Sequence, residues 1–372
     1  MKDVRSPSST ASSMPDTPAY LTTEGDPVQP GCRPKREANH RGWLRMIALA
    51  GLLLLLAGCG LASVTKTTGP ARRMGWIEQD SGTGNNLFGV CFTNVNNGWA
   101  VGEAGLLLAT SDGGAHWRSI SSGTWQTLWA VTFTDRLHGW VLADHAVIRT
   151  SDEGRSWSLV QLDSDLTLHA LAFTDRLHGI AVGLIGRGDR QVGIILRTSD
   201  GGQRWGTAWE QSSAFPGVGT VNPSAIGVVD RQHIVVASTR GVVLSSGDGG
   251  ESWSLAAHSA SAAGIQSLAF PAGSRGWAVG DGGRILQTPD GGRTWRLRET
   301  IGQSYLSAVA FPSKLEGWIV GGEGTLLRTS DGGAHWSAVA GLPRSKGVVA
   351  ESWVSPGRGW AVGDGGCIYA YR

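Results

Sequence analysis

Six aspartates recur in one short phrase along the chain, and carboxylates at fixed spacing are the first candidates for acid chemistry. Each copy fits S/T-x-D-x-G-x-x-W, as in segments 110–117 and 329–336, which both read TSDGGAHW. The aspartates of the phrase are Asp112, Asp152, Asp200, Asp248, Asp290 and Asp331. Paired carboxylates act as acid, base or nucleophile in glycoside hydrolysis. Six equivalent copies instead indicate a structural turn, in which Asp accepts backbone N–H groups and Gly permits positive φ.

The phrase resembles the Asp-box, or bacterial neuraminidase repeat, and this resemblance raises sialidase chemistry as a hypothesis. A sialidase needs a tyrosine nucleophile, and the repeat region offers only Tyr305, Tyr369 and Tyr371. The last two belong to the terminal strand, and Tyr305 is better interpreted as an aromatic leading into an inner strand. We therefore predict no catalytic residue. A cell-envelope carbohydrate-active enzyme, sialidase-like or another glycoside hydrolase, stays as the alternative.

Two departures from the repeat offer a binding site instead. Segment 183–193 carries Arg187, Asp189 and Arg190, and segment 206–222 carries Trp209 and Phe215. We predict that both are loop insertions on the face opposite the Asp-boxes, where function is added to a repeat scaffold. The arginines can pair with a carboxylate, and an aromatic can serve as a desolvated anchor. These five residues form the predicted partner-binding site.

Two further sets of charged residues recur in register. The acidic set consists of Glu103, Asp144, Asp281, Glu323 and Asp364. It is compatible with a ring of carboxylates for a cation or basic peptide, but short-turn residues beside glycine are the favoured interpretation. The arginines that precede three Asp-boxes, Arg149, Arg197 and Arg328, are predicted to be solvated residues of the outer face.

The spacing of the phrase identifies the elements that carry these residues. The closing tryptophans fall at 117, 157, 205, 253, 295 and 336, so the period is 40 to 48 residues. One unit contains four short apolar segments, 87–92, 98–102, 105–110 and 117–120. Four strands per unit at this period are typical of a β-propeller blade. Twelve of the seventeen tryptophans occupy just two repeat positions, which indicates core packing.

The ring is predicted to close through the N-terminal strand. The last unit ends at Arg372 before a fourth strand, whereas residues 74–78 have the register of a strand that follows an Asp-box. The predicted fold is therefore all-β, a seven-bladed β-propeller of four-stranded blades over residues 74–372. Closure covers the two edges that an open array would expose. The blade after Trp205 is the least regular, with Val235 at its Gly-Trp position.

The region before the propeller has a different character. Residues 1–42 are dominated by Ser, Thr and Pro and are predicted to be disordered. Residues 43–59 combine a positive flank with a short apolar run, which predicts a secretory signal. The run ends in Leu-Ala-Gly-Cys at 56–59 and resembles a lipobox, which implies a lipid on Cys59. Residues 60–73 are the predicted linker. The propeller is expected in the cell envelope, outside the cytoplasm and anchored to a membrane.

Charge and cysteine content exclude several classes of function. Beyond residue 58 the chain has 25 basic and 25 acidic residues, so nothing indicates nucleic-acid binding. Cys91 and Cys367 fall in predicted strands of different blades. Two such cysteines are more often buried apolar residues than a disulfide or metal pair. We predict neither a metal nor a cofactor.

Together these features resemble the photosystem II stability/assembly factor family. The features are the lipobox, the lone strand around Trp76, units reading GWxVGxxGxLLxTxDGGxxW, and the ending GWAVGDGGCIYAYR. The resemblance covers about residues 74–372 and extends to bacterial relatives outside photosynthesis. It implies a non-enzymatic, lipid-anchored propeller that binds a protein or peptide partner, such as a membrane-protein precursor, as an assembly or scaffold factor.

Overall fold

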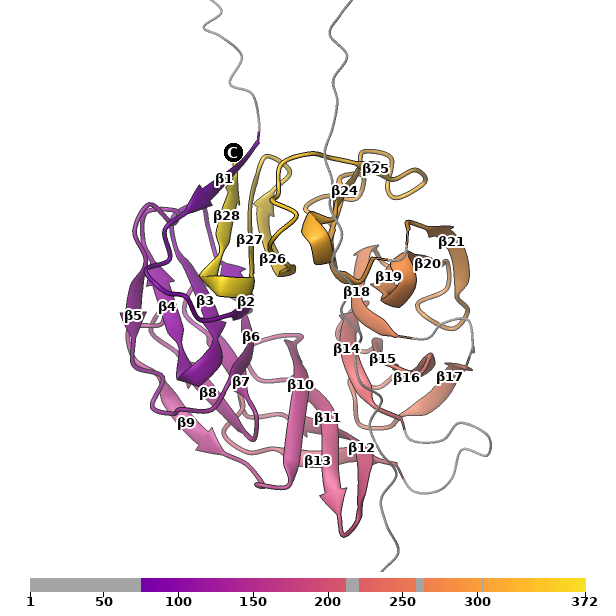
Figure 1. Cartoon of the computed structure of the whole chain (residues 1–372). Helices are drawn as coiled ribbons and strands as arrows, with labels where there is room; N and C mark the ends of the chain where they lie inside the picture. Colours follow the sequence, from indigo (N-terminus) through magenta and orange to yellow (C-terminus); the bar gives the residue numbers. More distant parts are fainter. Residues whose placement is uncertain (1–74, 212–220, 259–263, 303) are drawn as a thin grey trace, which may run out of the picture. The chain divides into compact units, whose positions relative to one another are not determined.

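The computed structural model describes residues 75–211, 221–258, 264–302 and 304–372. Within them the chain forms seven four-stranded antiparallel sheets around a ring, which confirms the predicted seven-bladed β-propeller (Figure 1). The first strand of each blade lies near the centre and the fourth at the rim. Among these residues, no helix has the length and apolar character that a membrane crossing requires. Cys59, Phe215 and the predicted segments before the propeller lie outside the described residues.

The first four blades follow one another along the chain. Blade 1 consists of β2 (Leu87–Phe92), β3 (Gly98–Gly102), β4 (Leu107–Thr110) and β5 (Arg118–Ile120). Blade 2 consists of β6 (Leu128–Phe133), β7 (Gly139–Ala143), β8 (Ala146–Thr150) and β9 (Ser158–Gln161). Blade 3 consists of β10 (Leu166–Phe173), β11 (Gly179–Arg187), β12 (Arg190–Thr198) and β13 (Gly206–Glu210). Blade 4 consists of β14 (Pro223–Val228), β15 (Ile234–Ser238), β16 (Val242–Ser246) and β17 (Ser254–His258).

The remaining blades complete the ring. Blade 5 consists of β18 (Ile265–Ala272), β19 (Arg275–Gly280), β20 (Arg284–Thr288) and β21 (Arg296–Thr300). Blade 6 consists of β22 (Leu306–Ala310), β23 (Gly317–Gly321), β24 (Leu326–Thr329) and β25 (Ser337–Ala338). Blade 7 consists of β26 (Val348–Ser355), β27 (Arg358–Gly363), β28 (Ile368–Tyr371) and β1 (Trp76–Gln79). Because β1 pairs with β28, the two ends of the ring share one sheet, as predicted.

Aromatic stacks between neighbouring blades form much of the core. The tryptophan of the second strand stacks with an aromatic ring on the inner strand of the next blade or, in the case of Phe311, directly after that strand. Trp140 and Phe173 stack with ring centroids 3.6 Å apart and planes 10° from parallel. The other such pairs are Phe92–Trp360, Trp99–Phe133, Trp277–Phe311 and Trp318–Trp353. Four of these tryptophans, Trp140, Trp277, Trp318 and Trp360, are fully buried.

The glycine before each of these tryptophans has a steric cause. A Cβ atom on Gly139 would lie 2.5 Å from the ring of Phe133, which packs over that backbone from the paired strand. Gly98 meets Phe92 in the same way at 2.5 Å. The Gly-Trp dipeptide therefore holds one aromatic ring of its own blade and presents another to the next blade. These two packing contacts, one made by the glycine and one by the tryptophan, explain why the dipeptide recurs.

The seam of the ring repeats this packing with residues from both ends. Trp76 on β1 meets Trp353 edge-on with centroids 5.6 Å apart. Trp117, the Asp-box tryptophan of blade 1, meets Phe92 edge-on at 5.8 Å in the same way. Trp76 thus takes the place of the Asp-box tryptophan that blade 7 lacks. The N-terminal strand closes the ring through its side chain as well as its backbone.

Candidate functional site

The six Asp-box carboxylates are bound within their own turns. Asp112 Oδ1 accepts hydrogen bonds from the His116 backbone N–H at 3.0 Å and from the Thr110 hydroxyl at 2.9 Å. The other five aspartates accept the same two kinds of hydrogen bond. The hydrogen bonds from the His116 backbone and side chain lower the pKa of Asp112 to about 2. A carboxylate that stays ionised in this way is a turn-stabilising acceptor and a poor proton donor.

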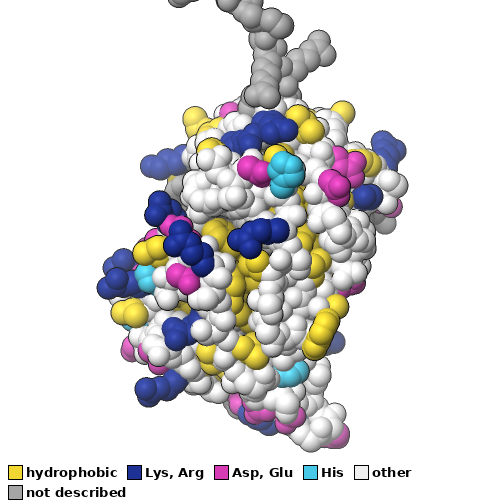
Figure 2. All heavy atoms as spheres, turned by 90° about the vertical axis from the view of Figure 1, so that its left-hand side faces the viewer, with side chains coloured by type: hydrophobic (Ala, Val, Ile, Leu, Met, Phe, Trp, Pro, Cys, Tyr) yellow, Lys and Arg dark blue, Asp and Glu magenta, His cyan; other side chains and the backbone are white. Residues whose placement is uncertain are grey.

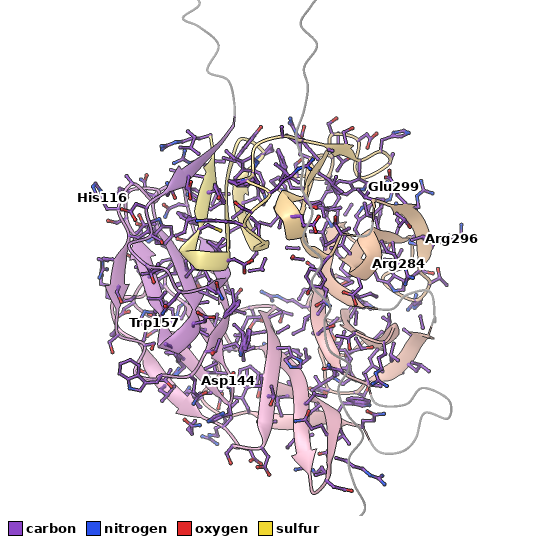
Figure 3. All side chains as sticks on the ribbon, viewed as in Figure 1. His116, Asp144, Trp157, Arg284, Arg296 and Glu299 are labelled. Atoms are coloured by element: carbon purple, nitrogen blue, oxygen red, sulfur yellow. The ribbon has the colours of Figure 1, made fainter. Side chains whose placement is uncertain are left out.

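The recurring acidic residues of the opposite face are also mostly bound. Glu103 accepts hydrogen bonds from the Asn86 backbone N–H at 3.1 Å and its side-chain amide at 2.8 Å. Asp144 accepts from the Trp129 indole at 2.8 Å and lies nearer the ring centre than His116 at the rim (Figure 3). Glu323 differs, since it is an exposed turn residue with φ of 55°. Within the described residues, no cluster of His, Cys, Asp or Glu could hold a metal ion.

The candidate tyrosine and the cysteines lack the environment of reactive groups. Burial raises the pKa of Tyr305, with Asp281 adding to the effect, so its phenol is less acidic than usual. Cys91 is half-buried and Cys367 is buried, and both are free thiols. Burial raises the pKa of each to about 11. A thiol with a raised pKa is a poor nucleophile at neutral pH.

The arginines that precede the Asp-boxes are partly exposed, whereas the sequence predicts solvated residues of the outer face. Arg328 lies over the Trp318 ring at 5.3 Å and binds Glu316 at 2.9 Å. Arg197 binds Glu251 of the next blade at 3.1 Å, and its side chain is 23% exposed. The Nε atom of Arg149 is buried.

The predicted binding site on blade 3 differs in detail from the sequence expectation. Segment 183–193 is not a loop, because β11 and β12 continue through it to a two-residue turn at 188–189. Arg187 at the end of this hairpin binds Glu210 through two hydrogen bonds of 2.8 and 2.9 Å. Trp209 lies in the fourth strand β13, half-buried against the core between blades 3 and 4. Asp189 and Arg190 are exposed at the hairpin tip.

Three turns that the sequence analysis overlooked carry a better-defined set of exposed arginines. The turns at 134–138 (TDRLH), 174–178 (TDRLH) and 229–233 (VDRQH) join the first two strands of blades 2, 3 and 4. We call them the DRxH turns. Each hydrogen-bonds the Asp-box turn of its own blade, as Leu177 O accepts from Gly201 N at 2.9 Å. They therefore lie on the Asp-box face. Their threefold recurrence was the signal that could have found them.

The aspartate of each DRxH turn accepts hydrogen bonds from the turn, and the arginine is exposed to solvent. Asp135 Oδ1 accepts the backbone N–H groups of Leu137 and His138 at 2.7 and 2.8 Å. His138 Nδ1 also lies 2.9 Å from Asp135 Oδ2. Burial acts to raise the pKa of Asp135, but the hydrogen bonds from His138 and Leu137 outweigh it and the pKa falls below its usual value. The arginines that follow the three aspartates, Arg136, Arg176 and Arg231, are exposed.

The charge that the DRxH turns expose to solvent is mainly positive. The Arg136 and Arg231 side chains are 70% and 77% exposed, whereas their partners Glu153 and Asp175 are 18% and 22% exposed. A hollow of about 390 Å³ lies between the turns, lined by Arg176, Arg231 and Leu177 among others. On the side of the ring where β5 and β9 lie, Lys and Arg side chains gather along the left edge of the view (Figure 2). Arginines beside exposed leucines suit an acidic, partly apolar peptide.

Comparison with known proteins gives consistent results. The family model described as "Photosynthesis system II assembly factor YCF48" matches residues 70–167, 117–268 and 260–370. A curated relative, "Photosystem II assembly lipoprotein Ycf48" of Synechococcus sp. (strain RCC307), is 36% identical over 77 residues. That alignment covers 21% of this chain and 22% of the relative, so it spans about a fifth of the relative's length.

Solved structures support the fold. A structure of YCF48 bound to a D1 peptide has a TM-score of 0.62 and 22% identity, and covers 80% of this chain and 96% of that one. The GH74 xyloglucanase from Xanthomonas campestris has a TM-score of 0.58 and 17% identity, and covers 80% of this chain and 53% of that one. At these identities the likeness concerns the propeller alone, which carries many unrelated functions.

Proposed function

Because this chain belongs to the photosynthesis system II assembly factor YCF48 family, we propose that it is a non-enzymatic assembly factor that binds a peptide segment of a membrane-protein precursor. The observation that carries the proposal is the set of DRxH turns on three consecutive blades. The aspartates of these turns accept hydrogen bonds from the turns' own backbone. The guanidinium groups of Arg136 and Arg231 stay largely exposed beside the less exposed Glu153 and Asp175, so they present positive charge to a ligand carboxylate. A D1 peptide is bound by a solved YCF48 structure, and we propose the same class of ligand here.

The geometry favours this surface over the blade 3 hairpin. Arg187 binds Glu210 through two hydrogen bonds and is 47% exposed, whereas Arg136 and Arg231, which also have ion-pair partners, are 70% and 77% exposed. Trp209 is half-buried in a strand and offers only part of its ring. The hairpin tip keeps Asp189 and Arg190, whose opposite charges give no clear preference for an anion. The hairpin is therefore the second candidate surface for the same function.

Peptide binding by matched variants tests the proposal. Fluorescence anisotropy with a labelled D1 peptide would compare the full-length chain with the triple variant Arg136→Gln, Arg176→Gln, Arg231→Gln. We expect the triple variant to bind at least about tenfold more weakly, and binding to fall as salt rises. Arg190→Gln at the hairpin tip is the matched control and should bind like the parent. The reverse order of effects would assign the function to the hairpin, and equal binding by all three proteins would reject both surfaces.

The proposal includes a lipid anchor at Cys59 that holds the propeller in the cell envelope. Support comes from the lipobox at 56–59 and from the curated relative that is called a lipoprotein. A carbohydrate-active enzyme is not favoured. The Asp-box carboxylates are bound in turns, and Tyr305 has a raised pKa where a nucleophile needs a lowered one.

A further inference from the structure

Trp125 is the most exposed large hydrophobic side chain of the described residues, with 88% of its surface in contact with solvent. It lies in the loop between β5 and β6, on the face opposite the Asp-boxes. No ring contact or hydrogen bond holds its side chain within the described part of the chain. Exposing an indole to water to this extent is unfavourable, and the fold does not require it. We therefore expect Trp125 to contact a ligand or partner.

The repeat supplies an internal control for this loop. Residues 122–126 (SGTWQ) and 81–85 (SGTGN) occupy equivalent places in successive blades. In both, the Ser hydroxyl donates to the Thr carbonyl, at 3.1 Å from Ser122 and 3.3 Å from Ser81. Both also pack on a turn glycine, because a Cβ on Gly105 or Gly366 would lie about 2 Å from the Thr carbonyl oxygen. The position of Trp125 is Gly84 in the second loop, so the loop does not need a tryptophan to form.

A hollow of about 460 Å³ adjoins Trp125 and is formed by three separate segments. They are the turn at 104–106, the end of β5 with its loop at 119–125, and Asn85 from the preceding blade junction. None of the lining residues carries a charge. The hydroxyls of Ser119 and Ser121 and the carboxamide of Asn85 are exposed and make no hydrogen bond within the described part of the chain. Ligand sites commonly combine an apolar wall with a few free polar groups at this size.

We infer that this hollow is a binding site for a neutral saccharide. The flat, electron-rich indole of Trp125 suits the C–H face of a pyranose ring, which carries a weak positive potential. Hydroxyls and a carboxamide both donate and accept, which matches sugar hydroxyls. The absence of charge from the lining disfavours phosphorylated or carboxylated ligands. A purely apolar ligand would leave Ser119, Ser121 and Asn85 without partners. The site is independent of the DRxH turns, which lie on the other face.

Titration of the full-length chain with neutral hexasaccharides tests the inference. The probes are cellohexaose and chitohexaose, with β-linkages, and maltohexaose, with α-linkages, each followed by calorimetry and saturation-transfer NMR. We expect at least one probe to bind at millimolar concentration. Trp125→Gly, which copies the sequence of the second loop, should weaken that binding at least about tenfold while the melting temperature stays at the parent value. Absence of binding by all three probes would overturn the inference.

Two further measurements separate a built site from general adhesion to tryptophan. Ser119→Ala combined with Ser121→Ala removes two hydroxyls from the lining of the hollow and keeps Trp125. We expect this double variant to bind the saccharide more weakly than the parent, and unchanged binding would mean that the hollow contributes nothing. D1-peptide binding should be unchanged in Trp125→Gly. A parallel loss of peptide binding would assign Trp125 to the peptide surface and reject the saccharide site.

Discussion

Glu351 occupies an inner-strand position that is aliphatic in the other six blades. The equivalent residues are Val90, Val131, Leu171, Ile226, Leu268 and Val309. Its Oε1 atom is buried without a hydrogen-bond partner among the described residues, and Oε2 accepts from the Trp353 indole at 2.7 Å. Burial raises the pKa of Glu351 well above its usual 4.5, and the hydrogen bonds from Trp353 and Ala310 offset this only in part.

The raised pKa predicts a pH-dependent contribution to stability. The folded chain keeps the Glu351 proton at pH values where the unfolded chain, with a pKa near 4.5, has lost it. Its contribution to the free energy of unfolding should therefore be constant at lower pH. It should then fall by up to about 1.4 kcal/mol per pH unit until the pH passes the folded pKa. Glu351→Gln, which keeps an acceptor for Trp353, should remove this slope in urea unfolding at several pH values. Parallel pH curves for the two proteins would contradict the prediction.

Residues that recur could be interpreted from the sequence, and residues that occur once could not. Asp112 and its five equivalents indicate a turn from the sequence alone, because catalysis does not need six identical sites. Glu351 and Trp125 each differ from the residues at the equivalent positions of other blades. A repeat motif and its period do not show whether such a single difference has a function. Their significance depends on what surrounds the equivalent positions in other blades. Only the packed structure gives that comparison.

At the level of elements, β1 depends on one large side chain for its place in the ring. Trp76 contacts Trp318, Trp353 and Tyr371, with ring centroids 5.5 to 5.9 Å away. We expect Trp76→Ala to lower the free energy of unfolding by about 3 kcal/mol, through loss of buried aromatic surface. Ile77→Ala is the matched control on the same strand. Its side chain is 44% exposed, so we expect a loss below about 1 kcal/mol. Urea unfolding measures both, and equal losses would show that the seam is held by backbone pairing alone.

Strand pairing was easier to predict than strand length. The pairing of β1 with β28 followed from counting strands, because the last unit lacks a fourth strand and the N-terminal segment supplies one. The extent of β11 and β12 did not follow, because extra residues in a repeat are as typical of a loop insertion as of a longer hairpin. Alternating apolar residues such as Ile185 and Val192 continue through that segment, and Gly-Asp at 188–189 supplies a two-residue turn. A departure from the repeat length therefore marked a longer hairpin.

At the scale of the whole molecule, the proposed anchor should act independently of the folded ring. Cys59→Ala should abolish metabolic labelling with radioactive palmitate and move the protein from the detergent phase to the aqueous phase in partitioning experiments. The melting temperature should not change, because Cys59 lies 17 residues before Trp76, where the first strand β1 begins. Retained labelling would place the lipid on another residue. A lower melting temperature would mean that the segment around Cys59 also supports the ring.

The seam between β1 and β28 has a consequence for the order of events during synthesis. A ribosome makes Trp76 at the beginning of the ring and Tyr371 at its end, yet the two residues are direct partners in one sheet. Blades 1 to 6 can each form as soon as their own four strands have emerged, but blade 7 has to wait until β28 has been made. A chain released early would leave β1 with an unpaired edge and Trp76 in water. Closure of the ring therefore has to follow the synthesis of β28, and products interrupted before that strand should be recognised by proteases through their open seam.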